Sequence, residues 1–445
     1  MPGAAPSEVV ELVQQMIRNK CVNDGSAESG EEVRNASLLA DYLHGAGIDV
    51  ERYEPATGRT SLVARIEGSD PDAPSLCLLG HTDVVPVNEE RWTHDPFGGE
   101  LIDGYVWGRG AIDMFNLTGS MAVAFRNLAT SGFKPKGTLI YIAVADEEAM
   151  GLYGAEHLTA HEADAVRCDY LITESGGMPM PSPAGMRLPA LVEEKGPMWS
   201  RIKVRGTPGH GSMPFGTDNA IVTAGEVVRR LAAHRPPARI GETWRSFVAG
   251  LGFPEEMAGP LLQPEGFDDV CAVLPPGLAK MAHACTHTTI TPTVVKGGDK
   301  TNIIPDTVEI ELDVRVLPGD GAAQIREQVA DALGDLMPAV ELFVGREDTA
   351  TSSPAGTPLW EAMTRAASRF YPDASLVPML MPGASDARWF RRNVDAVAYG
   401  FGIFSTNLGL EQLSAMGHGD DERVDVESLD MAVELWDALA RDFLG

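Results

Sequence analysis

Apolar positions along the first 175 residues follow two different periods. Some stretches repeat an apolar residue every three or four positions, as an amphipathic helix does, and others are short continuous apolar runs typical of buried strands. The predicted helices lie at residues 8–18, 32–46, 118–129 and 152–160, and the predicted strands at residues 61–66, 76–80, 138–145 and 170–173. Helices that alternate with buried strands favour an α/β sheet covered by helices on both faces.

The pattern changes after about residue 189. Residues 307–316 alternate strictly between polar and apolar side chains, which predicts an antiparallel strand with one wet face. The other elements predicted in this region are strands at 198–204, 288–295 and 340–344 and helices at 220–233 and 322–333. The resulting β-α-β-β-α-β order is typical of a small α+β domain. Residues 240–286, rich in Pro and Gly, interrupt it as an insertion whose role the sequence leaves open.

The α/β pattern returns from about residue 354. The last predicted elements are helices at 357–369 and 425–442 and strands at 377–381 and 395–400. The smaller domain is therefore expected to be inserted into the larger one, and a length of 445 residues agrees with more than one compact unit. The predicted division is 1–188 and 348–445 for the larger domain and 189–347 for the inserted domain.

Composition and charge narrow the possible partners. The chain has 35 basic and 64 acidic residues, a net charge of −29, so nucleic acid and anionic membranes are not expected to bind it. It has no apolar run of about 20 residues and no basic and apolar secretory signal at its start. Its five cysteines lack the spacing of a thiolate zinc site or a disulfide framework, so a reducing cytoplasm is the expected location.

Short clusters of histidine and carboxylate residues follow several predicted strands. His81 comes at the carboxyl end of strand 76–80, the edge where ligand sites form in open α/β sheets. Asp83, two residues later, could fix the second ring nitrogen of a metal-bound His81. An ordinary strand end followed by a turn aspartate is the alternative for this pair.

Two further clusters are rich in carboxylates. Asp113 closes a glycine-rich loop just before helix 118–129, and Asp146, Glu147 and Glu148 follow the strongest strand. Because adjacent carboxylates repel one another, a metal ion would stabilise them, and one glutamate could bind it while its neighbour serves as general base. A helix-start aspartate and an acidic surface loop are the alternatives.

Single candidate ligands lie at two more positions. Glu174 follows strand 170–173, and His418 lies in a loop between two glycines. The complete candidate set is His81, Asp113, Glu148, Glu174 and His418. Two imidazoles and three carboxylates suit borderline metals, chiefly zinc, at two adjacent sites that share the aspartate.

In this order and spacing, the motifs resemble the di-zinc metallopeptidases that include aminoacylase, succinyl-diaminopimelate desuccinylase, acetylornithine deacetylase and glutamate carboxypeptidase. The resemblance extends from about residue 8 to 443 and implies a catalytic domain with an inserted lid and dimerisation domain. It implies two Zn²⁺ per chain, with Co²⁺ or Mn²⁺ as possible replacements. The roles that it implies are zinc ligation by His81, Asp113, Glu148, Glu174 and His418, general-base action by Glu147, and orientation of His81 by Asp83.

Residues outside the metal set also match this family. The resemblance implies that His210 stabilises the oxyanion in the partner's active site. It also implies that Asn302 contacts the substrate and that Arg315 binds the carboxylate of the substrate. Gly383 and Ser385 belong to a segment, 383–388, that resembles the substrate-side loop. Two departures are Phe115, where many members have lysine, and the insertion at 240–286.

The expected activity is metal-dependent hydrolysis of an amide bond in N-acyl amino acids or at the C-terminal residue of small peptides. Glu174, where aminopeptidases have aspartate, and Arg315 favour a substrate with a free carboxylate. A dipeptidase or N-carbamoyl amino acid hydrolase is the alternative, and a non-catalytic metal-stabilised binding protein is a remote one. A serine hydrolase is disfavoured because Ser212 lies outside any GxSxG motif. Since a lid on a hinge can lie far from its own metals, we expect a homodimer that presents His210 to the neighbouring chain.

Overall fold

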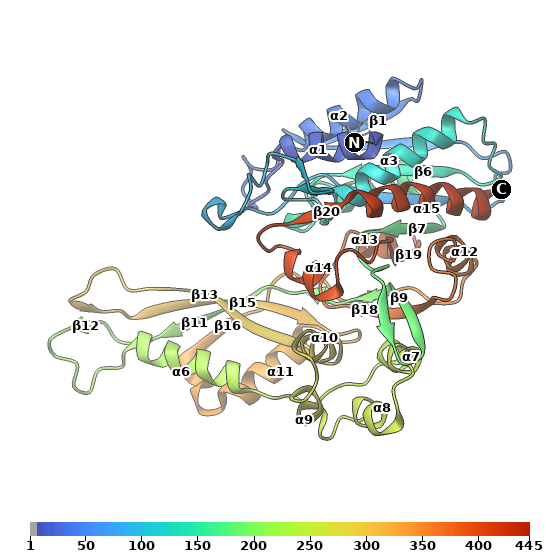
Figure 1. Ribbon diagram of the computed structural model, residues 1–445. Coiled ribbons are helices and arrows are strands. Elements are labelled where there is room, and N and C mark those ends of the chain that lie inside the picture. Colours follow the sequence, from blue (N-terminus) through green and yellow to red (C-terminus); the bar gives the residue numbers. More distant parts are fainter. Residues whose placement is uncertain (1–6) are drawn as a thin grey trace.

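A ten-stranded mixed sheet forms the centre of the larger part of the molecule (Figure 1). The computed structural model describes residues 7–445. The strands follow the order β1 (Val50–Ala56), β2 (Arg59–Ile66), β6 (Leu139–Val144), β3 (Leu76–His81), β7 (Tyr170–Thr173), β19 (Val397–Gly400), β9 (Gly185–Glu194) and β17 (Thr351–Ser352), and β8 (Met180–Ser182) and β18 (Ser375–Met381) also pair with β9. Strands β6, β3, β7 and β19 run parallel, so their carboxyl ends meet at one edge of the sheet.

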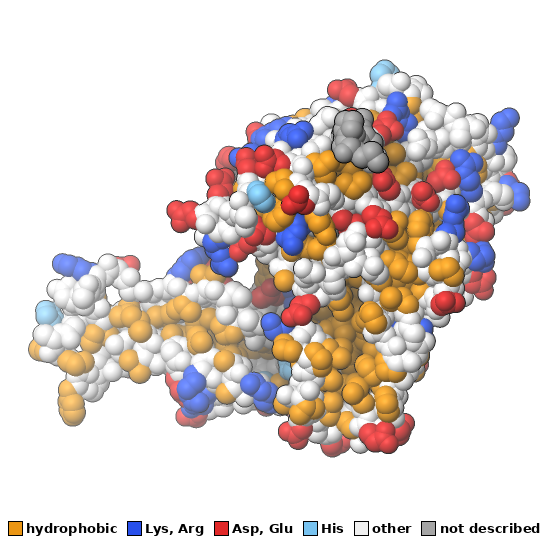
Figure 2. All heavy atoms as spheres, viewed as in Figure 1, with side chains coloured by type: hydrophobic (Ala, Val, Ile, Leu, Met, Phe, Trp, Pro, Cys, Tyr) orange, Lys and Arg blue, Asp and Glu red, His pale blue; other side chains and the backbone are white. Residues whose placement is uncertain are grey.

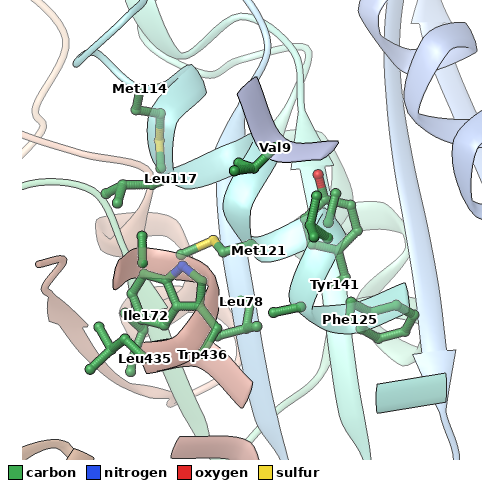
Figure 3. Packing of buried hydrophobic residues seen from close by; sticks show 14 of the residues in the cluster. Val9, Leu78, Met114, Leu117, Met121, Phe125, Tyr141, Ile172, Leu435 and Trp436 are labelled. Atoms are coloured by element: carbon green, nitrogen blue, oxygen red, sulfur yellow. The ribbon is translucent and has the colours of Figure 1, made fainter. Parts of the chain in front are cut away.

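Helices cover both faces of this sheet. One face packs against α1 (Glu8–Arg18), α2 (Val33–His44), α3 (Phe115–Thr130), α12 (Pro358–Ala367) and α15 (Val426–Leu444). The opposite face packs against α4 (Ala155–His161) and α13 (Ala387–Asn393). Successive residues of β3 alternate between the two cores, with Leu78 in the first, beside Trp436 and Met121, and Leu79 in the second (Figure 3). This arrangement confirms the predicted α/β sheet with helices on both faces.

A second, antiparallel sheet carries the inserted α+β unit. It contains β10 (Gly196–Pro197), β11 (Ser200–Arg205), β13 (Thr289–Gly297), β15 (Thr307–Val316) and β16 (Val340–Phe343). Along β15 every second residue is buried, and these residues pack against α6 (Ala220–Ala233) and α11 (Ala322–Leu333). The predicted period-two strand with one wet face is therefore confirmed. The short pair β12 (Gly209–His210) and β14 (Ile303–Ile304) lies at the far end of this arm (Figure 1).

The insertion at residues 240–286 is helical. Its elements are α7 (Glu242–Leu251), α8 (Glu255–Leu261), α9 (Phe267–Cys271) and α10 (Pro276–Thr286). Phe247 and Leu251 of α7 share one apolar core with Val377 and Leu380 of β18. The insertion thus packs between the inserted unit and strands β9 and β18 of the large sheet.

The remaining elements are short. They are α5 (Ala163–Val166), α14 (Leu410–Met416), and a small sheet of β20 (Arg423–Asp425), β5 (Tyr105–Trp107) and β4 (Glu100–Ile102). Strand β9 crosses the predicted domain boundary at residue 189, and the division into 1–188, 189–347 and 348–445 stays a prediction. Among residues 7–445, no helix is both long and apolar enough to cross a membrane.

Candidate active site

The carboxyl ends of β3 and β7 bring together the first group of candidate ligands. His81, Asp113 and Glu174 each offer a ligand atom within 4.8 Å of the others. The Nδ1 atom of His81 lies 3.0 Å from the Asp83 carbonyl oxygen, which can only accept, so Nδ1 carries a proton. The Nε2 lone pair of His81 therefore faces Oδ1 of Asp113 at 3.3 Å. Two electron-rich atoms at this distance need a cation between them or a second proton on the ring.

The second group of ligands shares Asp113 with the first. Asp113, Glu148 and His418 offer atoms within 4.8 Å of one another. His418 Nε2 lies 3.3 Å from Asp113 Oδ2 and 3.1 Å from Glu148 Oε2. Two ligand atoms bound tetrahedrally to one zinc ion lie about 3.3 Å apart, because each is about 2.0–2.1 Å from the metal. The spacing of these ligand atoms is therefore compatible with a metal ion of this size bound between them.

The electrostatics of the site also favour bound cations. Burial raises the pKa of Glu174 and of Glu147 well above the ordinary value, and neighbouring carboxylates add to the shift. Contacts with Asp113 and then Glu148 raise the pKa of His418 to about 10. Oε1 of Glu148 is buried without a hydrogen-bond partner in the described chain. A metal ion in each group would offset the clustered negative charge and give this oxygen a partner.

Asp83 organises the acidic turn that follows β6. Its carboxylate is fully buried and accepts hydrogen bonds from the backbone N–H groups of Glu147, at 3.2 Å, and Glu148, at 3.1 Å. A third bond of 2.9 Å comes from the side-chain amide of Asn23. Asp83 thus fixes the two glutamates, and it lies beside His81 Nδ1 at 3.6 Å. The sequence missed Asn23, which is 60 residues away along the chain.

Glu422 supports the loops that carry Asp113 and His418. It is fully buried, forms an ion pair of 2.6 Å with Arg109, and accepts the N–H groups of Ile112 and Asp113 at 2.8 and 3.1 Å. Arg109 also donates to the Gly419 carbonyl at 2.8 Å, beside His418. The only sequence signal for Glu422 was an acidic run after His418, which also fits a solvated loop.

Asp386 is a second acidic group that the sequence did not single out. Both of its carboxylate oxygens are buried and lack a hydrogen-bond partner within residues 7–445. Burial raises its pKa to about 7, and the nearby charge of Asp386 contributes to the raised pKa of Glu147. Asp386 belongs to the 383–388 loop, which thus approaches the catalytic cluster from the side of α13.

The other two predicted residues of that loop have neighbours in the large sheet. Ser385 is buried, and its N–H and hydroxyl group both donate to Glu194 Oε2, at 2.6 and 2.9 Å. The Gly383 carbonyl accepts from the backbone N–H of Lys195 at 3.1 Å. These bonds tie the loop to the end of β9.

His210 and Asn302 lie together but away from the metal-ligand groups of their own chain. His210 is in β12 at the far end of the arm, while the ligand groups lie at the edge of the large sheet (Figure 1). Asn302 precedes β14, and its carbonyl oxygen accepts from the N–H of Gly211 at 2.9 Å. Arg315, on β15, is held by Asp313 through bonds of 2.7 and 3.2 Å.

The fold brings the five candidate ligand residues together at one edge of a mixed sheet, an arrangement typical of a metal-dependent hydrolase. Residues 77–442 match the model of peptidase family M20/M25/M40, and the chain belongs to this family of metal-dependent hydrolases. The chain is 28% identical to aminoacylase-1 from Sus scrofa over 449 residues, which cover 98% of this chain and 96% of the relative.

Solved structures show the same fold. An M20 family metallo-carboxypeptidase from Sulfolobus solfataricus matches with a TM-score of 0.74 at 16% identity, covering 98% of this chain and 99% of the other. A dinuclear metal-binding peptidase of the family from Bacillus subtilis matches with a TM-score of 0.59 at 16% identity, covering 98% of both chains. These comparisons confirm the predicted family and its two-part architecture.

Proposed function

We propose that this enzyme hydrolyses the amide bond of N-acyl amino acids, or of the C-terminal residue of small peptides, with two zinc ions. The ions would be held by His81, Asp113 and Glu174 on one side and by Asp113, Glu148 and His418 on the other. The observation that carries this proposal is the pair of ligand groups that share Asp113. The similarity to aminoacylase-1 over nearly the whole of both chains supports the substrate class.

Glu147 is the proposed general base. Bound metal ions would supply polarisation of the scissile carbonyl group and a water molecule of lowered pKa. Glu147 would take the proton of that water and pass it to the leaving nitrogen. Asp83 supports this role because its bond to the backbone of Glu147 fixes the position of the turn from which the carboxylate extends.

His210 is proposed to donate a hydrogen bond to the developing oxyanion in the partner's site. The N–H of Ser212 lies 3.2 Å from His210 Nδ1 and can only donate, so Nδ1 accepts it. The ring proton of neutral His210 is therefore on Nε2, and this exposed N–H can serve as an oxyanion donor. Because His210 lies far from its own metal-ligand groups, this role requires a second chain.

A homodimer through the lid is therefore part of the proposal. Apolar side chains gather along the arm and at its far end (Figure 2). Large ones exposed there are Met213, Phe215, Ile221 and Val222, with Phe215 fully exposed. Edge strand β13 adds Val295, which is 58% exposed. An exposed apolar surface beside an open strand edge is typical of an interface between subunits.

Arg315 is proposed to bind the free carboxylate of the substrate. Asp313 holds the guanidinium through Nε and Nη2, and Nη1 forms no hydrogen bond within the described chain. The guanidinium is thus oriented while one donor edge stays available for a carboxylate. Asn302 is proposed as a second substrate contact, and Gly383 and Ser385 as parts of the substrate-side loop. The five free cysteines support a cytoplasmic location.

A substrate panel tests this proposal. The zinc-loaded chain would be assayed on N-acyl amino acids, the amides of the same compounds, dipeptides and N-carbamoyl amino acids, with a Glu147→Gln chain as the background control. We expect the highest kcat/KM on acyl amino acids or small peptides with a free carboxylate. Hydrolysis of dipeptides alone would exclude N-acyl amino acids as substrates and favour the dipeptidase alternative, and hydrolysis of no amide would contradict the reaction.

A further inference from the structure

A third cluster of metal-type ligands lies in the helical insertion, away from the active site. Asp268 of α9 and His283 and His287 at the end of α10 each offer a ligand atom within 4.8 Å of the other two. His283 lies in the last turn of α10 and His287 directly follows the helix, and their rings lie side by side with centroids 4.0 Å apart. The sequence itself does not indicate a role for the insertion.

His287 is oriented as a metal-binding imidazole. Its Nδ1 atom lies 2.9 Å from the carbonyl oxygen of His283, which can only accept, and 2.9 Å from the Thr286 hydroxyl group. Because that hydroxyl group donates to the Ala282 carbonyl at 2.8 Å, Nδ1 carries the proton. Nε2 therefore keeps its lone pair. A ring whose first nitrogen donates to a backbone carbonyl while the second stays unprotonated is the usual arrangement of a histidine ligand.

The protonation of both rings is also compatible with a metal. Burial, the neighbouring His283 and the charge of Lys195 lower the pKa of His287 to about 4. Burial likewise lowers the pKa of His283, and nearby Lys195 and Arg235 add to this effect. These shifts favour the neutral form of both imidazoles, which is the form that binds a metal.

The atoms proposed to bind the metal have no other partner in the described chain, since the hydrogen bond of His287 uses Nδ1 and leaves Nε2 free. Within residues 7–445, neither the Asp268 carboxylate nor the His283 ring forms a hydrogen bond or an ion pair with another side chain. The two imidazoles stack in parallel with their centroids 4.0 Å apart. The His283 ring is half-buried, and one of its nitrogens already lies within 4.8 Å of the ligand atoms of the other two residues.

We propose that Asp268, His283 and His287 bind a zinc ion that joins α9 to α10. Two imidazoles and one carboxylate suit zinc and not calcium or magnesium, which prefer oxygen ligands alone. Asp268 is exposed, so water can complete the coordination.

The bound metal ion would stabilise the position of α9 within the insertion. Helix α9 has only five residues, too few to be stable alone. The end of α10 is already fixed, because buried Lys195 donates to the carbonyl oxygens of His287 and Ala284 at 2.8 and 3.2 Å. A metal ion bound by both His287 and Asp268 would hold α9 against the end of α10.

Zinc content measured on the full chain tests the site. Wild type and the His283→Gln and Asp268→Asn chains would be loaded with zinc chloride, gel-filtered and analysed by mass spectrometry for zinc per chain. We expect each variant to hold one zinc ion fewer than wild type while its hydrolytic rate is unchanged. Because only the difference counts, the result does not depend on how much metal the active site holds.

His234→Gln is the matched control, since His234 lines the same surface pocket as His283 but is outside the ligand group. It should keep the wild-type zinc content. Equal zinc in wild type and both ligand variants would overturn the site, and so would a loss of zinc in the His234→Gln chain as large as in the ligand variants. Asp268 is exposed, so Asp268→Asn gives a folded test chain even if His283→Gln destabilises the insertion.

Discussion

Replacing Asp83 by Asn should destabilise the fold as well as the active site. The Asp83 carboxylate accepts three N–H donors, from Asn23, Glu147 and Glu148. In the best orientation, the new amide oxygen keeps the bonds from Asn23 and Glu148. Its NH₂ group then faces the N–H of Glu147, and two buried donors lack acceptors. At about 1–3 kcal/mol for each unsatisfied donor, the expected loss is about 2–6 kcal/mol.

Asn23 cannot relieve this mismatch at low cost. Its own side-chain oxygen accepts from the N–H of Gly25 at 3.0 Å and from Arg59 at 3.3 Å. Turning the amide to face the new NH₂ group would break both bonds. The predicted loss therefore stays in the range given above.

Urea unfolding in the presence of a chelator measures this loss without the contribution of bound metal. Asp41→Asn is the matched control, because Asp41 is exposed on α2 and surface substitutions usually change stability by less than about 0.5 kcal/mol. With metal present, Asp83→Asn should also weaken zinc binding by about 10–100-fold. If Asp83→Asn and Asp41→Asn unfold at the same urea concentration with the same slope, the hydrogen-bonding role of Asp83 is wrong.

Three further predictions concern catalysis. Glu147→Gln should keep the zinc content but lower kcat by about 10²–10⁴-fold, since it removes the general base, and a wild-type kcat would assign that role to another residue. Arg315→Ala should reduce kcat/KM far more for acyl amino acids than for their amides, because only the former have a free carboxylate; equal losses would refute the binding of this carboxylate by Arg315. Mixing inactive Glu147→Gln chains with inactive His210→Ala chains should restore part of the activity, whereas mixed dimers that form but stay inactive would show that His210 acts within its own chain.

Elements with a strong single period were predictable from the sequence. Helices α1, α6 and α11 and strand β15 span the predicted residues 8–18, 220–233, 322–333 and 307–316. In each, one apolar face packs on a core, so the local pattern and the tertiary structure agree. Strand β9 was missed because Pro189 and the charged residues at its end interrupt the pattern. The helices of the insertion were missed because Pro and Gly divide them into short pieces.

Some residues of the candidate site could be predicted from the sequence and others could not. The convergence of the candidate ligand residues could be predicted because each follows a strand or lies in a glycine-rich loop, where metal ligands are common. The residues that support them could not. Glu422 and Arg109 are 313 positions apart and meet only in the folded chain, and each looks like an ordinary surface charge in the sequence. Asp386 likewise owes its raised pKa to burial in the folded chain, and no local sequence pattern indicates that burial.

Metal-dependent activity is the central claim, and back-titration with zinc tests it most directly. The His283→Gln chain would be used so that the separate site in the insertion does not contribute, and it would be depleted with a chelator. We predict that the depleted chain is inactive and that hydrolysis of an N-acyl amino acid returns as about two zinc ions bind per chain. Full activity in a chain that contains no metal would contradict the account.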